Sequence, residues 1–178
     1  MTRLTIAPLA ALALAACNQS SVSLTNATPA EVAKAEAAAG DIQIRPGQWE
    51  TNAQIIDVQM PGVPAEMRDM LAKKMEEGVK VSSCVTPDQV KDFDPGKGLD
   101  KAGQGCTYSN YTRSGGRLSS TLVCTSGGHS TTITSTGTYT ATSFTGESSI
   151  VSEGGPGGQT TMKSRVTARR TGDCTAEK

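Results

Sequence analysis

Alternating apolar and polar positions predict five strands in the second half of the chain. Short β-prone stretches are separated there by glycine-rich turns, which is typical of an antiparallel meander. In the last stretch Met162, Ser164, Val166 and Ala168 alternate with Lys163, Arg165, Thr167 and Arg169. One face of the sheet is therefore expected to be buried and the other solvated. The predicted strands run from Cys106 to Arg113, Arg117 to Thr125, Ser130 to Thr140, Ser143 to Val151 and Thr160 to Thr171.

Two further strands are predicted upstream, from Gln48 to Val58 and from Val79 to Val85. Between these two strands the spacing of apolar residues changes from that of a strand to that of a helix. A helix is predicted from Pro64 to Glu77, ending at Gly78, because apolar residues recur there at helical spacing. We expect this helix to cover the sheet with its apolar stripe, formed by Met67, Met70, Leu71 and Met75. The predicted fold class is mainly β, an antiparallel meander forming a curved sheet or partial barrel with one amphipathic helix.

The stretch before Ile42 is different in composition. Residues 18–41 are rich in Ser, Thr and Ala and contain no large aromatic residue, which favours a tether ahead of a single domain at 42–178. Within it, Thr28-Pro29-Ala30-Glu31 has capping-box spacing, so that a helix from Pro29 to Ala39 is one interpretation. A mostly disordered spacer is the alternative, because a helix of this length is marginal alone.

The N-terminus has the pattern of an export signal. An uncharged run from Leu4 to Ala16 follows Arg3, and it is too short to span a bilayer as a helix. Its end, Leu14-Ala15-Ala16-Cys17, resembles the lipobox of bacterial lipoprotein signals. We expect cleavage after residue 16 and attachment to the membrane by lipid on Cys17. An ordinary secretory signal is the alternative. By resemblance to the usual sorting rule, Asn18 favours the periplasmic face of the outer membrane.

Four cysteines remain for the domain. Export brings them into an oxidising compartment, and the supply of large apolar residues is thin, so two disulfides are expected. Sequence alone permits three pairings; we favour Cys84 with Cys106 and Cys124 with Cys174. A zinc site is a weaker alternative, because there is no CxxC pair and only one histidine.

Charge and side-chain chemistry exclude several classes of function. The 17 basic and 17 acidic residues balance, and loss of Arg3 with the signal leaves 16 against 17, which gives no support for a nucleic-acid partner. The single histidine, His129, lies at a predicted turn without an obvious nucleophile and acid around it. The acidic residues Asp88, Asp92, Asp94 and Asp100 lack calcium-loop spacing. We expect no catalytic residue, no resident metal and no cofactor.

Several segments together resemble a known family. They are Arg45-Pro46-Gly47-Gln48-Trp49-Glu50, Cys84-Val85-Thr86-Pro87, Leu122-Val123-Cys124, Gly137-Thr138-Tyr139 and Arg169-Arg170-Thr171-Gly172-Asp173-Cys174. In order and spacing they resemble the domain of unknown function 3617 family of exported proteobacterial proteins, over roughly residues 42–175. The resemblance implies an exported fold of this kind, and it carries over no catalytic residue.

Three functions fit these expectations. The first is a non-catalytic binding or structural module of the cell envelope, with an envelope protein as partner. The second is a carrier of an apolar ligand in a cavity between sheet and helix, with Trp49, Met67, Met70, Leu71 and Met75 facing the ligand. The third is Cu(I) binding by thioethers, including Met60.

Overall fold

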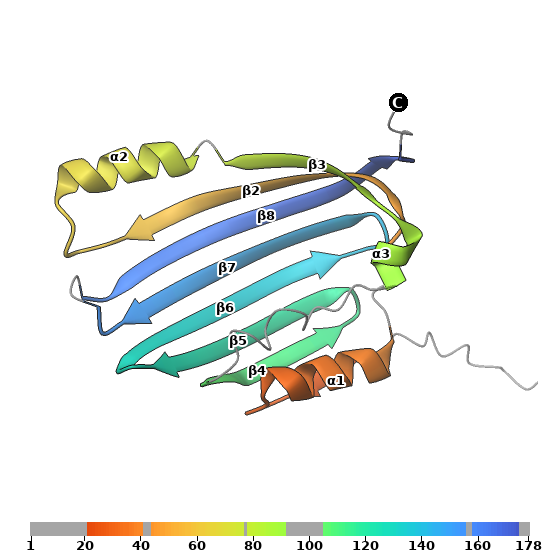
Figure 1. The fold of residues 1–178 in the computed structure, drawn as a ribbon, viewed down its shortest axis with the longest axis horizontal. Helices are drawn as coiled ribbons and strands as arrows, with labels where there is room; N and C mark the ends of the chain where they lie inside the picture. Colours follow the sequence, from red (N-terminus) through yellow and green to blue (C-terminus); the bar gives the residue numbers. More distant parts are fainter. Residues whose placement is uncertain (1–20, 41–43, 77, 92–104, 156–157, 175–178) are drawn as a thin grey trace, which may run out of the picture.

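A computed structural model describes residues 21–40, 44–76, 78–91, 105–155 and 158–174. The helices are α1 (Pro29–Ala39), α2 (Ala65–Glu76) and α3 (Pro87–Lys91). The strands are β1 (Val22–Leu24), β2 (Gly47–Gln59), β3 (Val79–Val85), β4 (Cys106–Ser114), β5 (Arg117–Ser126), β6 (His129–Tyr139), β7 (Ser143–Glu153) and β8 (Thr160–Gly172). They form one antiparallel sheet, which is not closed, in the order β1-β4-β5-β6-β7-β8-β2-β3 (Figure 1).

The predicted meander is confirmed for β4 to β8, each strand pairing with the next. Its first two turns each use two glycines with positive φ, 57° and 73° at Gly115 and Gly116, and 57° and 80° at Gly127 and Gly128. Such turns match the twist of the strands they join, and their positive φ angles favour glycine. The glycine pairs therefore set the lengths of β4, β5 and β6.

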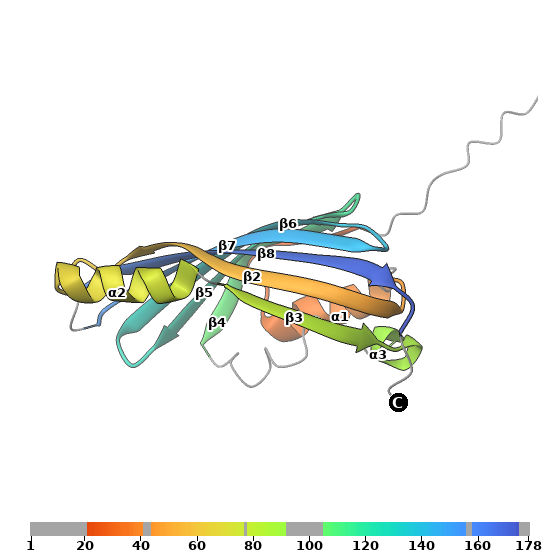
Figure 2. The same cartoon turned by 90° about the horizontal axis from the view of Figure 1, so that it is seen from above.

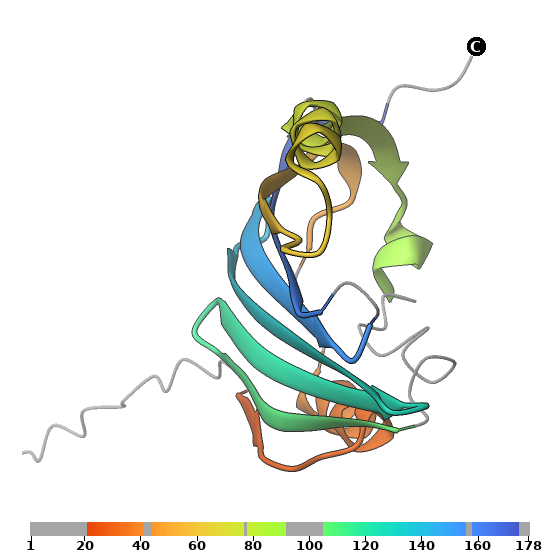
Figure 3. The same cartoon turned by 90° about the vertical axis from the view of Figure 1, so that its left-hand side faces the viewer.

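The sheet has two unlike faces and curves around the side on which α1 lies (Figure 3). We call that side the inner face. Tyr111, Ile133 and Val166 belong to the inner face, whereas Thr134 and Arg165 point to the outer face. Along β8 the exposure alternates from Met162 onward, as the sequence predicts. The register therefore places apolar residues on one side of the sheet.

The best-buried core lies between α1, β1 and one end of the sheet. Its members are Val22, Ala27, Val32, Cys106, Tyr108, Tyr111 and Leu122. Three of them precede residue 41, so residues 21–40 are part of the folded unit and the domain does not begin at Ile42. The expected tether is wrong for these residues, because their few apolar side chains cover the tyrosines of β4. The signal segment and Cys17 lie outside the described residues.

The alternative of a helix within 18–41 is confirmed, and its N-terminus has the expected capping box. The backbone N–H of Thr28 donates to Glu31 Oε2 at 2.7 Å, and the backbone N–H of Glu31 donates to Thr28 Oγ1 at 3.3 Å. The bond from the Thr28 backbone, and a second from Thr28 Oγ1 to Glu31 Oε2 at 2.9 Å, lower the pKa of Glu31 because they favour its ionised carboxylate. Pro29 occupies the first helical position and Gly40 ends the helix.

A buried ion pair joins α1 to β4. Glu36 Oε2 lies 2.6 Å from Arg113 Nε, and both side chains are almost completely buried. That N–H does not point straight at the oxygen, so the contact is an ion pair rather than a linear hydrogen bond. The hydroxyl of Tyr111 donates to the other oxygen of Glu36 at 2.9 Å, and Arg113 Nη2 donates to Gly40 O at 3.3 Å. The carboxylate thus has two partners inside the core.

The pKa values follow from this arrangement. Burial raises the pKa of the Tyr111 hydroxyl, and the hydrogen bond to Glu36 raises it further. Burial by itself would lower the pKa of Arg113, but the interactions with Glu36 and Tyr139 together outweigh burial and the net shift is upward. Tyr111 therefore stays protonated and Arg113 stays charged at neutral pH, as the network requires.

The predicted methionine helix forms, but it does not cover the sheet. Met67 and Met70 are 51% and 57% exposed. Because β2 and β3 pair only through residues 47–53 and 79–85, α2 is confined to the connection of a hairpin and lies beside the end of β2 (Figures 1 and 2). It continues along the edge on which β3 lies. The expectation that this helix covers the sheet is therefore wrong.

The two expected disulfides form, but with a different pairing. Cys84 bonds to Cys174 and Cys106 bonds to Cys124. Cys106 and Cys124 are direct register partners on neighbouring strands, whereas Cys84 and Cys174 close a corner that the strand order brings together. The favoured pairing of Cys84 with Cys106 and of Cys124 with Cys174 is wrong, because β2, not β4, lies next to β3.

Replacing Glu36 with Ala is expected to lower the free energy of unfolding by about 3–5 kcal/mol, because it leaves Arg113 charged and buried without its partner. Urea unfolding followed by circular dichroism measures this loss. Glu147→Ala is the control, since its pair with Arg165 is exposed and should contribute under about 1 kcal/mol. Equal losses in the two variants would mean that α1 does not depend on the buried pair.

Peptide mapping without reductant is expected to recover the peptide that contains Cys84 linked to the peptide that contains Cys174. The same digest after reduction should separate them and serves as the control. Replacing both cysteines with Ala should lower the free energy of unfolding by roughly 2–5 kcal/mol. Recovery of Cys84 linked to Cys106 would contradict the observed pairing.

Candidate functional site

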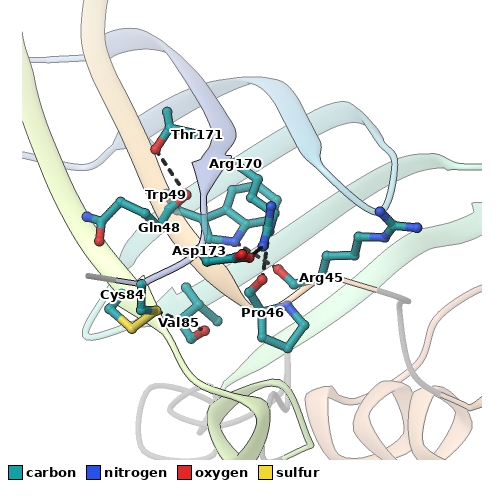
Figure 4. Close-up of polar contacts among 10 residues, drawn as sticks. Arg45, Pro46, Gln48, Trp49, Cys84, Val85, Arg170, Thr171 and Asp173 are labelled. Atoms are coloured by element: carbon teal, nitrogen blue, oxygen red, sulfur yellow. Dashed lines mark hydrogen bonds and ion pairs between the residues drawn. A yellow bond between two sulfur atoms is a disulfide. The ribbon is translucent and has the colours of Figure 1, made fainter. Parts of the chain in front are cut away.

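Three sequence motifs meet at one corner of the sheet, where β2 begins and β8 ends (Figure 4). The start of β2 carries Arg45 to Glu50, the end of β3 carries Cys84 and Val85, and the C-terminal motif includes Arg170 to Cys174. This corner is the first candidate for a functional site, because residues from distant parts of the chain converge there.

Trp49 is buried at this corner, on the inner face. Its indole N–H donates to the carbonyl oxygen of Arg45 at 3.0 Å. The backbone N–H of Arg45 in turn donates to Ala141 O at 2.8 Å. A ligand would find neither the ring surface nor the N–H of Trp49 free, so this residue, expected to face a ligand, acts here as packing.

Arg170 holds the beginning of β2 in place. Its Nε donates to Pro46 O at 2.6 Å, and its Nη2 pairs with Asp173. The close approach of the Arg170 side chain to the backbone of β2 requires glycine at position 47, where φ is 141°. A Cβ at this position would lie 2.5 Å from Arg170 Nε and would also collide with the carbonyl oxygen of Gly172. Gly47 and Arg170 therefore form one structural unit.

The corner is closed by the disulfide between Cys84 and Cys174 and by a hydrogen bond from Thr171 Oγ1 to Gln48 O at 3.2 Å. The polar groups described above are thus used inside the protein. The arrangement can hold two chain segments together, and it offers no free nucleophile or base. We interpret the corner as a structural clamp.

A second candidate is the inner face away from α1. One row of register partners crosses the sheet and is apolar throughout: Tyr108, Leu122, Ile133, Ile150, Met162 and Val58. Tyr108 and Leu122 are buried beside α1, whereas the other four side chains are only partly buried. The described residues therefore cover the row at one end alone.

A row of hydroxyl groups runs beside the apolar row. Ser120, Ser135, Ser148 and Ser164 are register partners on β5 to β8. Two of them, Ser148 and Ser164, share a hydrogen bond of 2.8 Å. The inner face thus offers apolar contact and hydrogen-bonding groups next to each other.

The outer face is polar and contains two hollows. One, of about 710 Å³, is lined mainly by hydroxyl and charged groups that include Lys80, Thr145 and Arg169. Another, of about 630 Å³, adjoins it at Thr145. Exposed ion pairs such as Arg169 with Glu50, at 2.7 Å, account for part of this charge. Both hollows are open to solvent, whereas a small-molecule site encloses most of its ligand.

The other predicted site residues are not brought together. Met67 and Met70 lie exposed on α2, and the side chains of Leu71 and Met75, like the Asp92, Asp94 and Asp100 carboxylates, lie outside the described residues. His129 is exposed at the β5–β6 turn. Within the described ranges, no group of three or more His, Cys, Asp or Glu side chains could hold a metal ion. Nor does any helix there have the length and apolar character to cross a bilayer.

Sequence reasoning missed two features. The ion pair of Glu36 with Arg113 has no local signal, since the two residues are far apart in the chain. The short helix α3 does have one: Thr86 and Gln89 form reciprocal hydrogen bonds of 2.8 and 3.2 Å. The spacing in Thr86-Pro87-Asp88-Gln89 matches that in Thr28-Pro29-Ala30-Glu31, which predicts a helix start in both places.

A family model described as "Protein of unknown function (DUF3617)" matches residues 44–174. This range includes all the motifs of the clamp and the strands β2 to β8. No curated protein and no solved structure matches the chain.

Replacing Gly47 with Ala is expected to destabilise the protein by about 1–3 kcal/mol from backbone strain alone, because φ is positive and the new Cβ meets Arg170. Thermal and urea unfolding measure this effect. Gly155→Ala is the control, since a Cβ there meets nothing within 4 Å. A loss no larger than that of the control would refute the clamp.

Proposed function

The chain belongs to the DUF3617 family of proteins of unknown function, and we propose that it is a non-catalytic binding module of the cell envelope. The proposal rests on the apolar row of the inner face, of which the described residues cover only one end. Contiguous apolar surface on a soluble domain marks a site of interaction. The four partly buried members are Val58, Ile133, Ile150 and Met162.

A protein surface fits this face better than a small apolar ligand. Sites for small ligands enclose most of the ligand surface. Here α2, the expected lid, lies beside the sheet, so it does not supply the wall that a carrier cavity would need. The serine row beside the apolar row offers hydroxyl groups that a polypeptide partner can meet with its own polar groups. We therefore propose that the partner is a protein.

The sequence and the disulfides support a place in the envelope. Disulfides persist in oxidising compartments, and the described cysteines are all paired. The uncharged N-terminal run that ends in Leu14-Ala15-Ala16-Cys17 favours export and lipid attachment at Cys17. With residues 21–40 folded onto the sheet, an anchor at Cys17 would hold the domain close to the membrane, so the partner should lie near the membrane surface.

A photoreactive amino acid at position 150 tests the proposal in the cells that produce the protein. Irradiation is expected to cross-link position 150 to one discrete protein, because Ile150 is a partly buried member of the row that no described element covers. Mass spectrometry of the cross-linked band identifies the partner.

The same group at position 134 is the matched control, since Thr134 is exposed on the outer face of the neighbouring strand. Cross-links at position 134 alone, or at neither position, would overturn the proposal. Circular dichroism must show the same β-sheet spectrum for both variants.

A further inference from the structure

The sheet ends at β3, and the outer edge of this strand has no partner strand in the part of the chain that the structure describes. One side of β3 pairs with β2 without a register shift over all seven of its residues. Every second residue of an edge strand directs its backbone N–H and C=O groups outward, where they can bond to another strand. The opposite edge is formed by β1, which has only three residues.

Exposed apolar side chains gather along the β3 edge. Val79 and Val81 are 63% and 50% exposed, and Met67 and Met70 lie on α2, which continues along this edge (Figure 2). Of the five large apolar residues that are exposed in the described ranges, only Ile56 is on neither element. Among the described residues, the edge therefore combines backbone groups that pair with no other strand with apolar side chains.

The strand also carries few of the features that keep edges apart. Proteins protect their edge strands with charges, proline, bulges or short length. The sequence of β3, Val-Lys-Val-Ser-Ser-Cys-Val, contains one charge, no proline and no bulge. This strand is suited to pairing with another strand.

We propose that β3 pairs antiparallel with β3 of a second copy of this chain. The strand is compatible with itself: centred on Val81 the pairing places Lys80 opposite Ser82, and centred on Ser82 it places Lys80 opposite Cys84. In neither register do two lysines face each other, and like charges directly opposite would destabilise the pair. The inner-face side chains at the contact, Val79, Val81, Ser83 and Val85, are apolar or small.

The twofold axis of such a pair is perpendicular to the sheet, so both inner faces lie on the same side of one continuous sheet. The two copies would then present their apolar rows to the same partner surface. The dimer does not require a partner on the inner face, because its contacts are at the edge.

Sedimentation equilibrium of the full chain, in a mild detergent at matched density, tests the dimer. The wild-type protein is expected to sediment as a dimer, and Val81→Lys is expected to raise the dissociation constant about tenfold or more, because it adds a charge to each edge at the contact. Thr134→Lys is the matched control: it places the same charge at an exposed β-branched position on an interior strand, and it should remain dimeric.

Hydrogen exchange of the wild-type protein tests the dimer independently, in case Val81→Lys folds poorly. In the wild-type protein, amides of alternate residues in β3 should exchange faster on dilution, while those of β6 should not change. A wild-type protein that is monomeric, or a dimer that Val81→Lys leaves intact, would overturn the inference. Cross-linking at position 150 is read separately, so either result can fail alone.

Discussion

The contact between α1 and the inner face of β4 determines how the sheet is completed. Burying a carboxylate and a guanidinium is costly unless they are paired and hydrogen-bonded, and Glu36, Arg113 and Tyr111 meet this condition only when α1 is docked. The pair also fixes the position of the helix, because an apolar contact alone would tolerate sliding. The segment ahead of the family-matched region thereby becomes part of the core.

The protein is braced at its two sides and open between them. On one side α1 and β1 cover the end of β4 and β5, together with the disulfide between Cys106 and Cys124. On the other side the clamp of Gly47 and Arg170, closed by Cys84 and Cys174, holds the first and last strands of the family-matched region next to each other. The strands in the middle have apolar inner-face residues with no described layer above them. A frame braced at both sides with such a face fits the proposed binding role, since binding gains from surfaces that do not have to be ordered first.

The elements themselves followed from local sequence. Each predicted strand differs from the observed one by few residues, because alternation with period two and glycine pairs at positive φ are properties of neighbouring residues. The capping spacing in Thr28-Pro29-Ala30-Glu31 placed α1 as one of two alternatives, and the same spacing at Thr86 could have placed α3. For the candidate sites the sequence was less informative. The family motifs were found, but their convergence into a clamp depends on β2 lying beside β8.

The sequence by itself determined the strands β2 to β8 and the helix α2, which side of β8 is apolar, and that four cysteines were available for two disulfides. The tertiary structure decided which helix covers the sheet, which cysteines pair and which cation forms an ion pair with Glu36. The reason is that these contacts join residues far apart in the sequence. A methionine stripe shows that α2 has an apolar side, but it does not say what that side packs on, and the hairpin of β2 and β3 confines it to an edge. Cys84 meets Cys174 across 90 residues, and Glu36 meets Tyr111 across 75. No pattern within a short window of sequence specifies contacts at such separations, because they depend on the order of strands in the finished sheet.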